Sequence, residues 1–320
     1  MMAADGAAPQ GRGDGEFAAA VLDGLNSRPR FIPSRFLYDA RGSELFEAIT
    51  RLDEYYLTRT EIGILRDRAG DIARLAGPGR ALVEFGSGSS RKTRILLDHL
   101  DDLAAYVPID ISTDALDGAV ARLNGSYPGL DIVPVEADFG APVELPREAE
   151  GAPRLGFFPG STIGNLETEE AVRFLANARD VLGPESSFIV GADLSKSPDI
   201  LIPAYDDASG VTAAFTLNLL RRINAELDAD FDLDAFAHEA VYNEAEARIE
   251  IYLRSLARQS VRVAGRSFDF GEGERIRTEY SHKYSIPRFR ELAGRAGWMT
   301  AHSWTDADRL FSLHYLLPAA

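Results

Sequence analysis

Residues 81–93 contain the densest run of side chains and glycines suited to holding a ligand. An apolar segment, residues 81–85, includes the acid Glu84 and runs directly into Gly86 and Gly88. Glycines after a buried strand let the backbone turn sharply and bring its N–H groups close to a ligand. The pattern predicts a binding crevice at the carboxyl end of a parallel strand, where open α/β sheets hold nucleotides.

Three ligand classes compete for this turn. A phosphate loop would match at Lys92 and Thr93, but Arg91 stands where its second glycine belongs. A dinucleotide fingerprint loses its third glycine at the same residue. S-adenosylmethionine has no pyrophosphate, and an acid such as Glu84 suits its cationic sulfonium. A methyltransferase is therefore favoured over an enzyme that binds ATP or NAD.

Acids also end the next expected strands. Asp110 ends the apolar run 105–110, about twenty residues past the glycines, where a carboxylate can take ribose hydroxyls. Asp138 ends the run 131–139 and can contact an adenine amino group, with Phe139 able to stack on the ring. Each acid alone fits a helix cap or a loop charge equally well. Acids at consecutive strand ends favour the ligand.

The hydrophobic pattern predicts an α/β fold with a doubly wound parallel sheet. Strands and helices alternate, and the chain closes with a helix and an antiparallel hairpin. The expected strands are 81–85, 105–110, 131–139, a strand that opens into a Gly-rich loop within 155–165, and 187–191 with Asp193 at its end. The expected helices are 93–100, 113–124, 167–182 and 288–296, and the expected hairpin pairs 299–305 with 309–316.

Two blocks fall outside this alternation and predict a second, smaller α+β domain that acts as a substrate-binding lid. One is 31–61; the other, 196–286, contains a helix at 211–227 and a small antiparallel meander. The expected domains are residues 62–195 with 287–320 for the ligand-binding sheet, and 16–61 with 196–286 for the lid. Residues 1–15 are expected to form a disordered tail.

Composition narrows the partners. The 34 Lys and Arg residues against 50 Asp and Glu residues give a formal charge of −16, which disfavours nucleic acids and anionic membranes. Zero cysteines exclude disulfides and thiolate sites, and the five histidines show no metal-ligand spacing. No apolar stretch is long enough to span a membrane, and no signal peptide is visible. We expect a cytoplasmic monomer with a small-molecule substrate and no metal.

Longer motifs resemble those of the L-histidine Nα-methyltransferases of ergothioneine biosynthesis. The similarity runs from about residue 33 to the closing hairpin, with the motifs in family order. They are Tyr55-Tyr56-Leu57-Thr58-Arg59-Thr60-Glu61, residues 84–93, Phe158-Pro159-Gly160-Ser161-Thr162-Ile163-Gly164-Asn165, Ala204-Tyr205-Asp206-Asp207, residues 210–218 and Arg277-Thr278-Glu279-Tyr280-Ser281-His282-Lys283. The resemblance implies a Rossmann-like class I methyltransferase that uses S-adenosylmethionine to trimethylate the α-amine of L-histidine, giving hercynine.

The resemblance also implies roles for single residues. Gly86, Lys92, Asp110, Asp138 and Phe139 match the S-adenosylmethionine contacts. Tyr56, Gly160, Asn165 and Tyr205 match residues around the amino-acid backbone of the substrate, with Asn165, Tyr56 and Tyr205 nearest the reaction, while Glu279 and Ser281 match those that face the imidazole. From the residues alone, Tyr56 fits a core aromatic and Asn165 a helix cap.

One departure concerns Ile251, where the family commonly has methionine beside the imidazole. Isoleucine keeps the apolar wall but is stiffer and lacks the polarizable sulfur. Another aromatic amino acid therefore stays open as the substrate. A non-enzymatic sensor of S-adenosylmethionine or a nucleotide is the alternative from another class.

Overall fold

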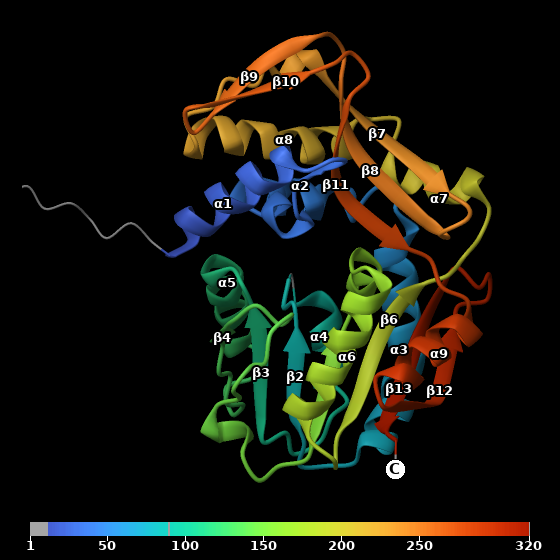
Figure 1. Ribbon diagram of the computed structural model, residues 1–320. Coiled ribbons are helices and arrows are strands. Elements are labelled where there is room, and N and C mark those ends of the chain that lie inside the picture. Colours follow the sequence, from blue (N-terminus) through green and yellow to red (C-terminus); the bar gives the residue numbers. More distant parts are fainter. Residues whose placement is uncertain (1–11, 89, 320) are drawn as a thin grey trace, which may run out of the picture. The chain divides into compact units, whose positions relative to one another are not determined.

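The computed structural model describes residues 12–319 apart from residue 89. The chain divides into two compact units. Among the described residues, the larger contains 50–204, 242–249 and 280–319, and the smaller contains 12–49, 205–241 and 250–279. Figure 1 labels the helices and strands.

The larger unit is built on a seven-stranded sheet with the order β12-β13-β6-β5-β2-β3-β4. Its strands are β2 (Ala81–Phe85), β3 (Ala105–Asp110), β4 (Val135–Glu136), β5 (Arg154–Phe158), β6 (Ser187–Asp193), β12 (Trp298–Thr305) and β13 (Phe311–Pro318). The five strands from β6 to β4 are parallel, and the β12–β13 hairpin pairs with β6 antiparallel. This confirms the predicted doubly wound sheet with its closing hairpin. The strand order reverses between β2 and β5, so the crevice for a ligand is expected where those strands end.

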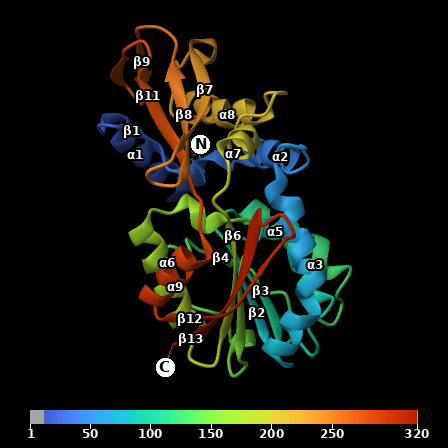
Figure 2. The ribbon, with the colours of Figure 1, turned by 90° about the vertical axis from the view of Figure 1, so that its right-hand side faces the viewer.

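Helices cover both faces of this sheet. Figure 2 shows α6 and α9 on one side and α3 and α5 on the other. The helices of the larger unit are α3 (Tyr56–Ala76), α4 (Arg91–Leu97), α5 (Thr113–Asn124), α6 (Thr168–Leu182) and α9 (Ile286–Arg295), with short 3₁₀ helices η2 (Arg147–Ala149) and η3 (Thr162–Asn165). Helix α7 (Pro198–Tyr205) ends at the first residue of a segment of the smaller unit. Strands β2 and β6 are buried along their whole length, which agrees with their mainly apolar sequences. Aromatic side chains fill the core under α6, where Phe174 packs on Phe85 and Phe158.

The smaller unit combines helices with a four-stranded sheet of order β1-β11-β8-β7 and a separate hairpin, β9–β10. Its strands are β1 (Arg30–Phe31), β7 (Phe236–Asn243), β8 (Arg248–Ser255), β9 (Gln259–Val263), β10 (Arg266–Phe270) and β11 (Arg275–His282). Its helices are α1 (Arg12–Asn26), α2 (Ala40–Ile49) and α8 (Val211–Glu226), with η1 (Ser34–Leu37) and η4 (Leu233–Ala235). The ends of β7, β8 and β11 continue into segments that belong to the larger unit.

Several details differ from the sequence-based expectations. Residues 12–15 of the expected disordered tail begin helix α1, and residues 1–11 lie outside the described residues. Strand β4 has two residues rather than the expected nine, and β7 was not anticipated. The expected antiparallel meander is wrong in part, because β1 joins β11 in parallel and β9–β10 forms its own sheet.

The unit boundaries also lie elsewhere than the proposed domains. Residues 50–61, 196–204, 242–249 and 280–286 group with the larger unit, whereas the pattern had placed them in the lid. In the part of the chain that the structure describes, no helix combines the length and the apolar character needed to cross a membrane.

One close approach in the larger unit fixes the identity of a residue. A Cβ atom on Gly191 of β6 would lie 2.3 Å from Oε1 of Glu61 and 3.2 Å from the ring of Phe311. Glu61 is fully buried on α3. Glycine at position 191 therefore lets the Glu61 carboxylate lie against the sheet.

We predict that Gly191→Ala lowers the free energy of unfolding by about 1–3 kcal/mol, because the added methyl group overpacks a buried site. The matched control is Gly63→Ala on α3, where an added Cβ meets nothing within 4 Å. This control should raise stability by up to about 1 kcal/mol, since alanine favours helix. Urea unfolding of both variants measures the difference. Equal effects of the two substitutions would contradict the close approach.

Candidate active site

The ends of β2, β3 and β4 converge on the glycine turn. Gly86 has a positive φ of 81°, and its N–H donates to the carbonyl of Ile109 at 2.8 Å. The Ser87 N–H donates to Oδ2 of Asp110 at 3.1 Å. A Cβ on Gly86 would lie 3.8 Å from the ring of Phe139. The turn, the carboxylate and the aromatic ring therefore meet at one edge of the larger unit.

Asp110 is poised to accept hydrogen bonds at this edge. Burial raises its pKa, and the N–H groups of Ser112 and Ser87 partly oppose that shift. Asp138 is exposed, and its Oδ1 accepts from the Gly140 N–H at 2.8 Å. The chemistry of this set fits S-adenosylmethionine: carboxylates for hydroxyl and amino groups, and a ring for the adenine.

Lys92 and Gly160 meet at a buried carboxylate that sequence reasoning did not single out. The Lys92 Nζ lies 2.5 Å from Oε2 of Glu61, whose side chain is 1% exposed. The same carboxylate accepts the Gly160 N–H at 2.9–3.0 Å. Gly160 and Ser161 both have positive φ, which turns the chain after β5 so that this N–H points at Glu61. Gly160 can therefore offer a ligand only its carbonyl oxygen.

The pairing of Lys92 also bears on the choice of ligand. A phosphate-loop lysine needs its charge for phosphate oxygens. Here a carboxylate already lies against the ammonium group, which weakens its attraction for a polyphosphate. A single carboxylate, such as that of a methionine moiety, carries less negative charge than a polyphosphate and so needs less positive charge from Lys92.

Glu84 does not have the role that its position before the turn indicated. It is 2% exposed, accepts a hydrogen bond from the Thr93 hydroxyl at 2.8 Å, and accepts another from Tyr106. Burial raises its pKa from 4.5 to about 8, so it is largely protonated at neutral pH. Glu84 therefore ties β2 to α4 and β3 and supplies no negative charge for a sulfonium.

Tyr56 belongs to a second buried ionic cluster, centred on Asp193 at the end of β6. The Tyr56 hydroxyl donates to the Asp193 carboxylate at 2.8–2.9 Å. Asp193 also forms ion pairs with Lys196 at 2.7 Å and Lys283 at 2.8 Å. Lys283 donates to the hydroxyl of Ser281 at 2.8 Å. Two predicted substrate residues, Tyr56 and Ser281, are thus joined through one carboxylate.

The chain contains only three lysines, Lys92, Lys196 and Lys283. Each forms an ion pair with a buried carboxylate, Glu61 or Asp193, at the carboxyl edge of the sheet. The other 31 basic residues are arginines. The scarcity of lysine is a signal in the sequence that could have identified Lys196 and Lys283.

Asn165 ends η3 and is half-buried. Its interpretation as a helix cap is wrong, because Glu167 caps α6 and Oε2 of Glu170 accepts from the Glu167 N–H at 3.0 Å. The preceding Gly164 approaches the β11 backbone, where a Cβ would lie 2.8 Å from the carbonyl of His282. This close packing fixes the backbone that presents Asn165.

The remaining predicted substrate residues belong to the smaller unit. Tyr205 is buried, and its carbonyl accepts from Nε2 of His238 at 2.8 Å. Ile251 is 2% exposed on β8, and its carbonyl accepts from Thr278 at 3.3 Å. Glu279 is half-buried on β11. Glu279 and Ser281 lie two residues apart on that strand and so point to the same face of it.

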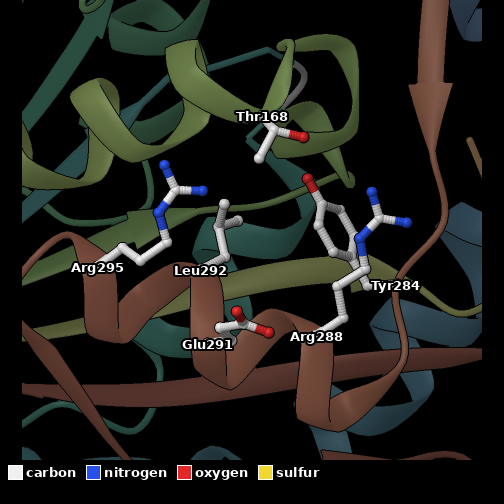
Figure 3. Close-up of a pocket in the computed structure, with 6 residues that line it drawn as sticks. All are labelled: Thr168, Tyr284, Arg288, Glu291, Leu292 and Arg295. Atoms are coloured by element: carbon white, nitrogen blue, oxygen red, sulfur yellow. The ribbon is translucent and has the colours of Figure 1, made fainter.

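A cavity of about 140 Å³ opens elsewhere in the larger unit, between α6 and α9. Figure 3 shows the side chains around it, which are Thr168, Tyr284, Arg288, Glu291, Leu292 and Arg295. Arg295 is paired with Glu169 at 2.7 Å, and the Tyr284 hydroxyl donates to the Ile163 carbonyl at 3.3 Å. None of the predicted site residues lines this cavity. Within the described residues, no group of three or more acidic or histidine side chains could hold a metal.

Comparisons with known proteins agree with this geometry. A family model described as histidine-specific, SAM-dependent methyltransferase matches residues 17–318. The chain is 44% identical over 317 residues to histidine N-alpha-methyltransferase of Mycolicibacterium smegmatis, covering 98% of this chain and 96% of that protein. It is 32% identical over 302 residues to ergothioneine biosynthesis protein 1 of Neurospora crassa, covering 90% of this chain and 33% of that protein. A solved S-adenosylmethionine-dependent methyltransferase from Clostridium acetobutylicum has a TM-score of 0.51 at 11% identity, covering 87% of this chain and 99% of that one, which shows the fold alone.

We predict that Glu84→Gln stabilises the protein increasingly as the pH rises from 5 to 8. Between its ordinary pKa of 4.5 and its folded pKa of about 8, Glu84 is ionised when unfolded and protonated when folded. The unfolded state therefore binds fewer protons, and stability from this group falls as the pH rises. Glutamine, always neutral, removes that loss.

Melting temperatures of the variant and the wild type at pH 5, 6.5 and 8 measure the difference. The control is Glu185→Gln, which removes an exposed carboxylate from the same unit. A difference that stays constant or shrinks with pH would contradict the protonated state of Glu84.

Proposed function

Because the chain belongs to the family of histidine-specific, S-adenosylmethionine-dependent methyltransferases, we propose that it trimethylates the α-amine of L-histidine. The product is the betaine hercynine, and the reaction is the first step of ergothioneine biosynthesis. The chain is an enzyme of the Rossmann-like class I methyltransferase fold.

One observation carries the proposal. Five candidate cofactor residues come from separate segments of the matched region and gather at one edge of the larger unit's sheet. They are Gly86, Lys92, Asp110, Asp138 and Phe139. We propose that Asp110 accepts from the ribose hydroxyls, that Asp138 and Phe139 hold the adenine, and that Lys92 faces the methionine carboxylate.

Methyl transfer makes simple demands on the protein. Bound S-adenosylmethionine supplies an electrophilic methyl group, and the amine must approach it in line, so positioning contributes most of the acceleration. We propose that the Gly160 carbonyl, Asn165 and Tyr56 hold the amino-acid backbone by neutral hydrogen bonds. The availability of only the carbonyl at Gly160 supports a contact with the amine, which carries the donors.

We propose that the smaller unit contributes Tyr205 to the substrate backbone and Ile251 and Glu279 to its ring, with Ser281 as a second imidazole contact. A carboxylate and a hydroxyl suit the two ring nitrogens of imidazole, whereas indole has one N–H and phenyl has none. Ile251 stands where the family commonly has methionine, so the ring wall is stiffer here. We also propose that the enzyme works in the cytoplasm, which the absence of cysteine supports, and that it acts as a monomer.

We predict that purified protein converts L-histidine, in the presence of S-adenosylmethionine, first to monomethyl-, then to dimethyl- and finally to trimethylhistidine. Mass spectrometry of samples taken over time measures the three products. The other natural amino acids, run in parallel, serve as controls and should give little product, because they leave the polar groups proposed around the imidazole unpaired. Faster methylation of another amino acid would contradict the substrate, and no methylation of any amino acid would contradict the activity.

We predict that Glu279→Ala lowers the initial rate on histidine about ten- to hundredfold, because a charged hydrogen bond to the imidazole is lost. Activity on tryptophan or phenylalanine should change much less, so the ratio of the rate on histidine to the rate on these amino acids should fall. Glu272→Ala, which removes an exposed carboxylate of the same unit, is the matched control. An unchanged ratio of histidine to tryptophan rates would remove Glu279 from the site.

A further inference from the structure

The Asp193 carboxylate lies in a fully buried and highly polar environment within the larger unit. Its side chain is 0% exposed, and it contacts Lys196, Lys283 and Tyr56. Its backbone N–H donates to the Ser161 hydroxyl at 2.9 Å, which fixes the end of β6 beside the loop that carries Gly160. Because a buried carboxylate needs all of these partners, its position is set by the fold.

This environment fixes the direction of the hydrogen bonds at Tyr56. A phenolic hydroxyl has one proton. Asp193, which forms ion pairs with two lysines, accepts the Tyr56 O–H, and its carboxylate lies 2.8–2.9 Å from the Tyr56 oxygen. Lys196 can only donate, and its Nζ lies 2.6 Å from the same oxygen. The proton of Tyr56 therefore points to Asp193, and toward any further group the phenolic oxygen can only accept.

The Tyr56 proton stays within the cluster when Lys196 changes its charge. Burial lowers the pKa of Lys196 to about 8; Lys283 also lowers it, while Asp193 and Asp306 oppose the shift. A neutral Lys196 nitrogen is itself an acceptor, so above pH 8 the proton of Tyr56 has acceptors on both sides. In neither state does Tyr56 become a donor to a third group.

A substrate carboxylate offers only acceptors, so it cannot pair with a hydroxyl oriented in this way. The α-amine offers N–H donors. We propose that Asp193 is a positioning residue that holds Tyr56 as a hydrogen-bond acceptor for the N–H of the methyl acceptor. This inference rests on the proposed function, and it assigns Tyr56 to the amine end of the amino acid.

The consequence differs among the three transfers. The neutral amine that reacts has two N–H bonds in histidine, one in the monomethyl intermediate and none in the dimethyl intermediate. Tyr56 therefore supports the first two transfers and gives no hydrogen bond to the reacting amine in the third.

The test measures kcat and KM separately for Tyr56→Phe on histidine, Nα-methylhistidine and Nα,Nα-dimethylhistidine, each with saturating S-adenosylmethionine. Loss of one hydrogen bond in the transition state should lower kcat/KM on histidine about ten- to hundredfold. On the dimethyl acceptor the loss should stay under about threefold. Tyr315→Phe removes a hydroxyl from a buried tyrosine on β13 and serves as the control. It should leave the ratio of kcat/KM on histidine to kcat/KM on dimethylhistidine unchanged.

Asp193→Asn tests the positioning role. An amide can donate to the Tyr56 oxygen, so the orientation of the Tyr56 hydroxyl is lost. The ratio of kcat/KM on histidine to kcat/KM on dimethylhistidine should then fall as it does in Tyr56→Phe. The double variant should show no further fall in this ratio, because Asp193 acts through Tyr56. If Asp193→Asn does not fold, Lys196→Met keeps Asp193 as the proton acceptor and should retain the wild-type ratio.

Equal losses of Tyr56→Phe on all three acceptors would overturn the inference, since Tyr56 would then contact a part that all three share. No loss on any acceptor would overturn it as well, as would a Lys196→Met ratio that falls like that of Tyr56→Phe. Wild-type protein that methylates none of the three acceptors would overturn the proposed function itself. If the wild type is active and Tyr56→Phe leaves the ratio of kcat/KM on histidine to kcat/KM on dimethylhistidine unchanged, only the assignment of Tyr56 is overturned.

Discussion

The carboxyl edge of the larger sheet depends on two buried carboxylates, Glu61 and Asp193. An ionised carboxylate is costly to remove from water unless cations and N–H groups come with it. Glu61 brings Lys92 and the Gly160 N–H to one point, and Asp193 brings Tyr56, Lys196 and Lys283 to another. These partners come from α3, α4, the loops after β5 and β6, and the residue after β11, so satisfying two charges positions five segments of the chain. Gly191 belongs to the same constraint, since only a residue without a Cβ leaves room for Glu61.

This arrangement decides which atoms of the edge can meet a ligand. The Gly160 N–H is used by Glu61, and the Tyr56 proton is used by Asp193. What both residues present is an acceptor, and an amine is the part of an amino acid that supplies donors. Because the Tyr56 hydroxyl donates to Asp193, a change in the number of N–H bonds on the amine must be absorbed elsewhere.

Patterns that depend on neighbours along the chain were predictable. The strands β2, β3, β5 and β6 follow from buried apolar runs that end in turns, and so do the positions of Gly86 and Asp110 at the ends of β2 and β3. Features that depend on distant partners were not. Strand β4 is short because its pairing with β3 covers two residues, and β1 joins β11 across some 240 residues of chain. Glu84 was misread for the same reason: its position beside the turn is local, but its burial among distant segments raises its pKa and keeps it protonated.

The choice of lysine at only three positions follows from the space available there. Arginine carries a planar group with five donors, whereas lysine carries a compact charge with three. Lys196 directs its donors at Asp193, Tyr56 and the Leu194 carbonyl, and Lys283 is 0% exposed between Asp193 and Ser281. A guanidinium at either place would bury donors beyond those that these partners accept, and each unmatched donor would cost free energy. Lys196 and Lys283 therefore lie where a compact charge matches the few acceptors that surround it.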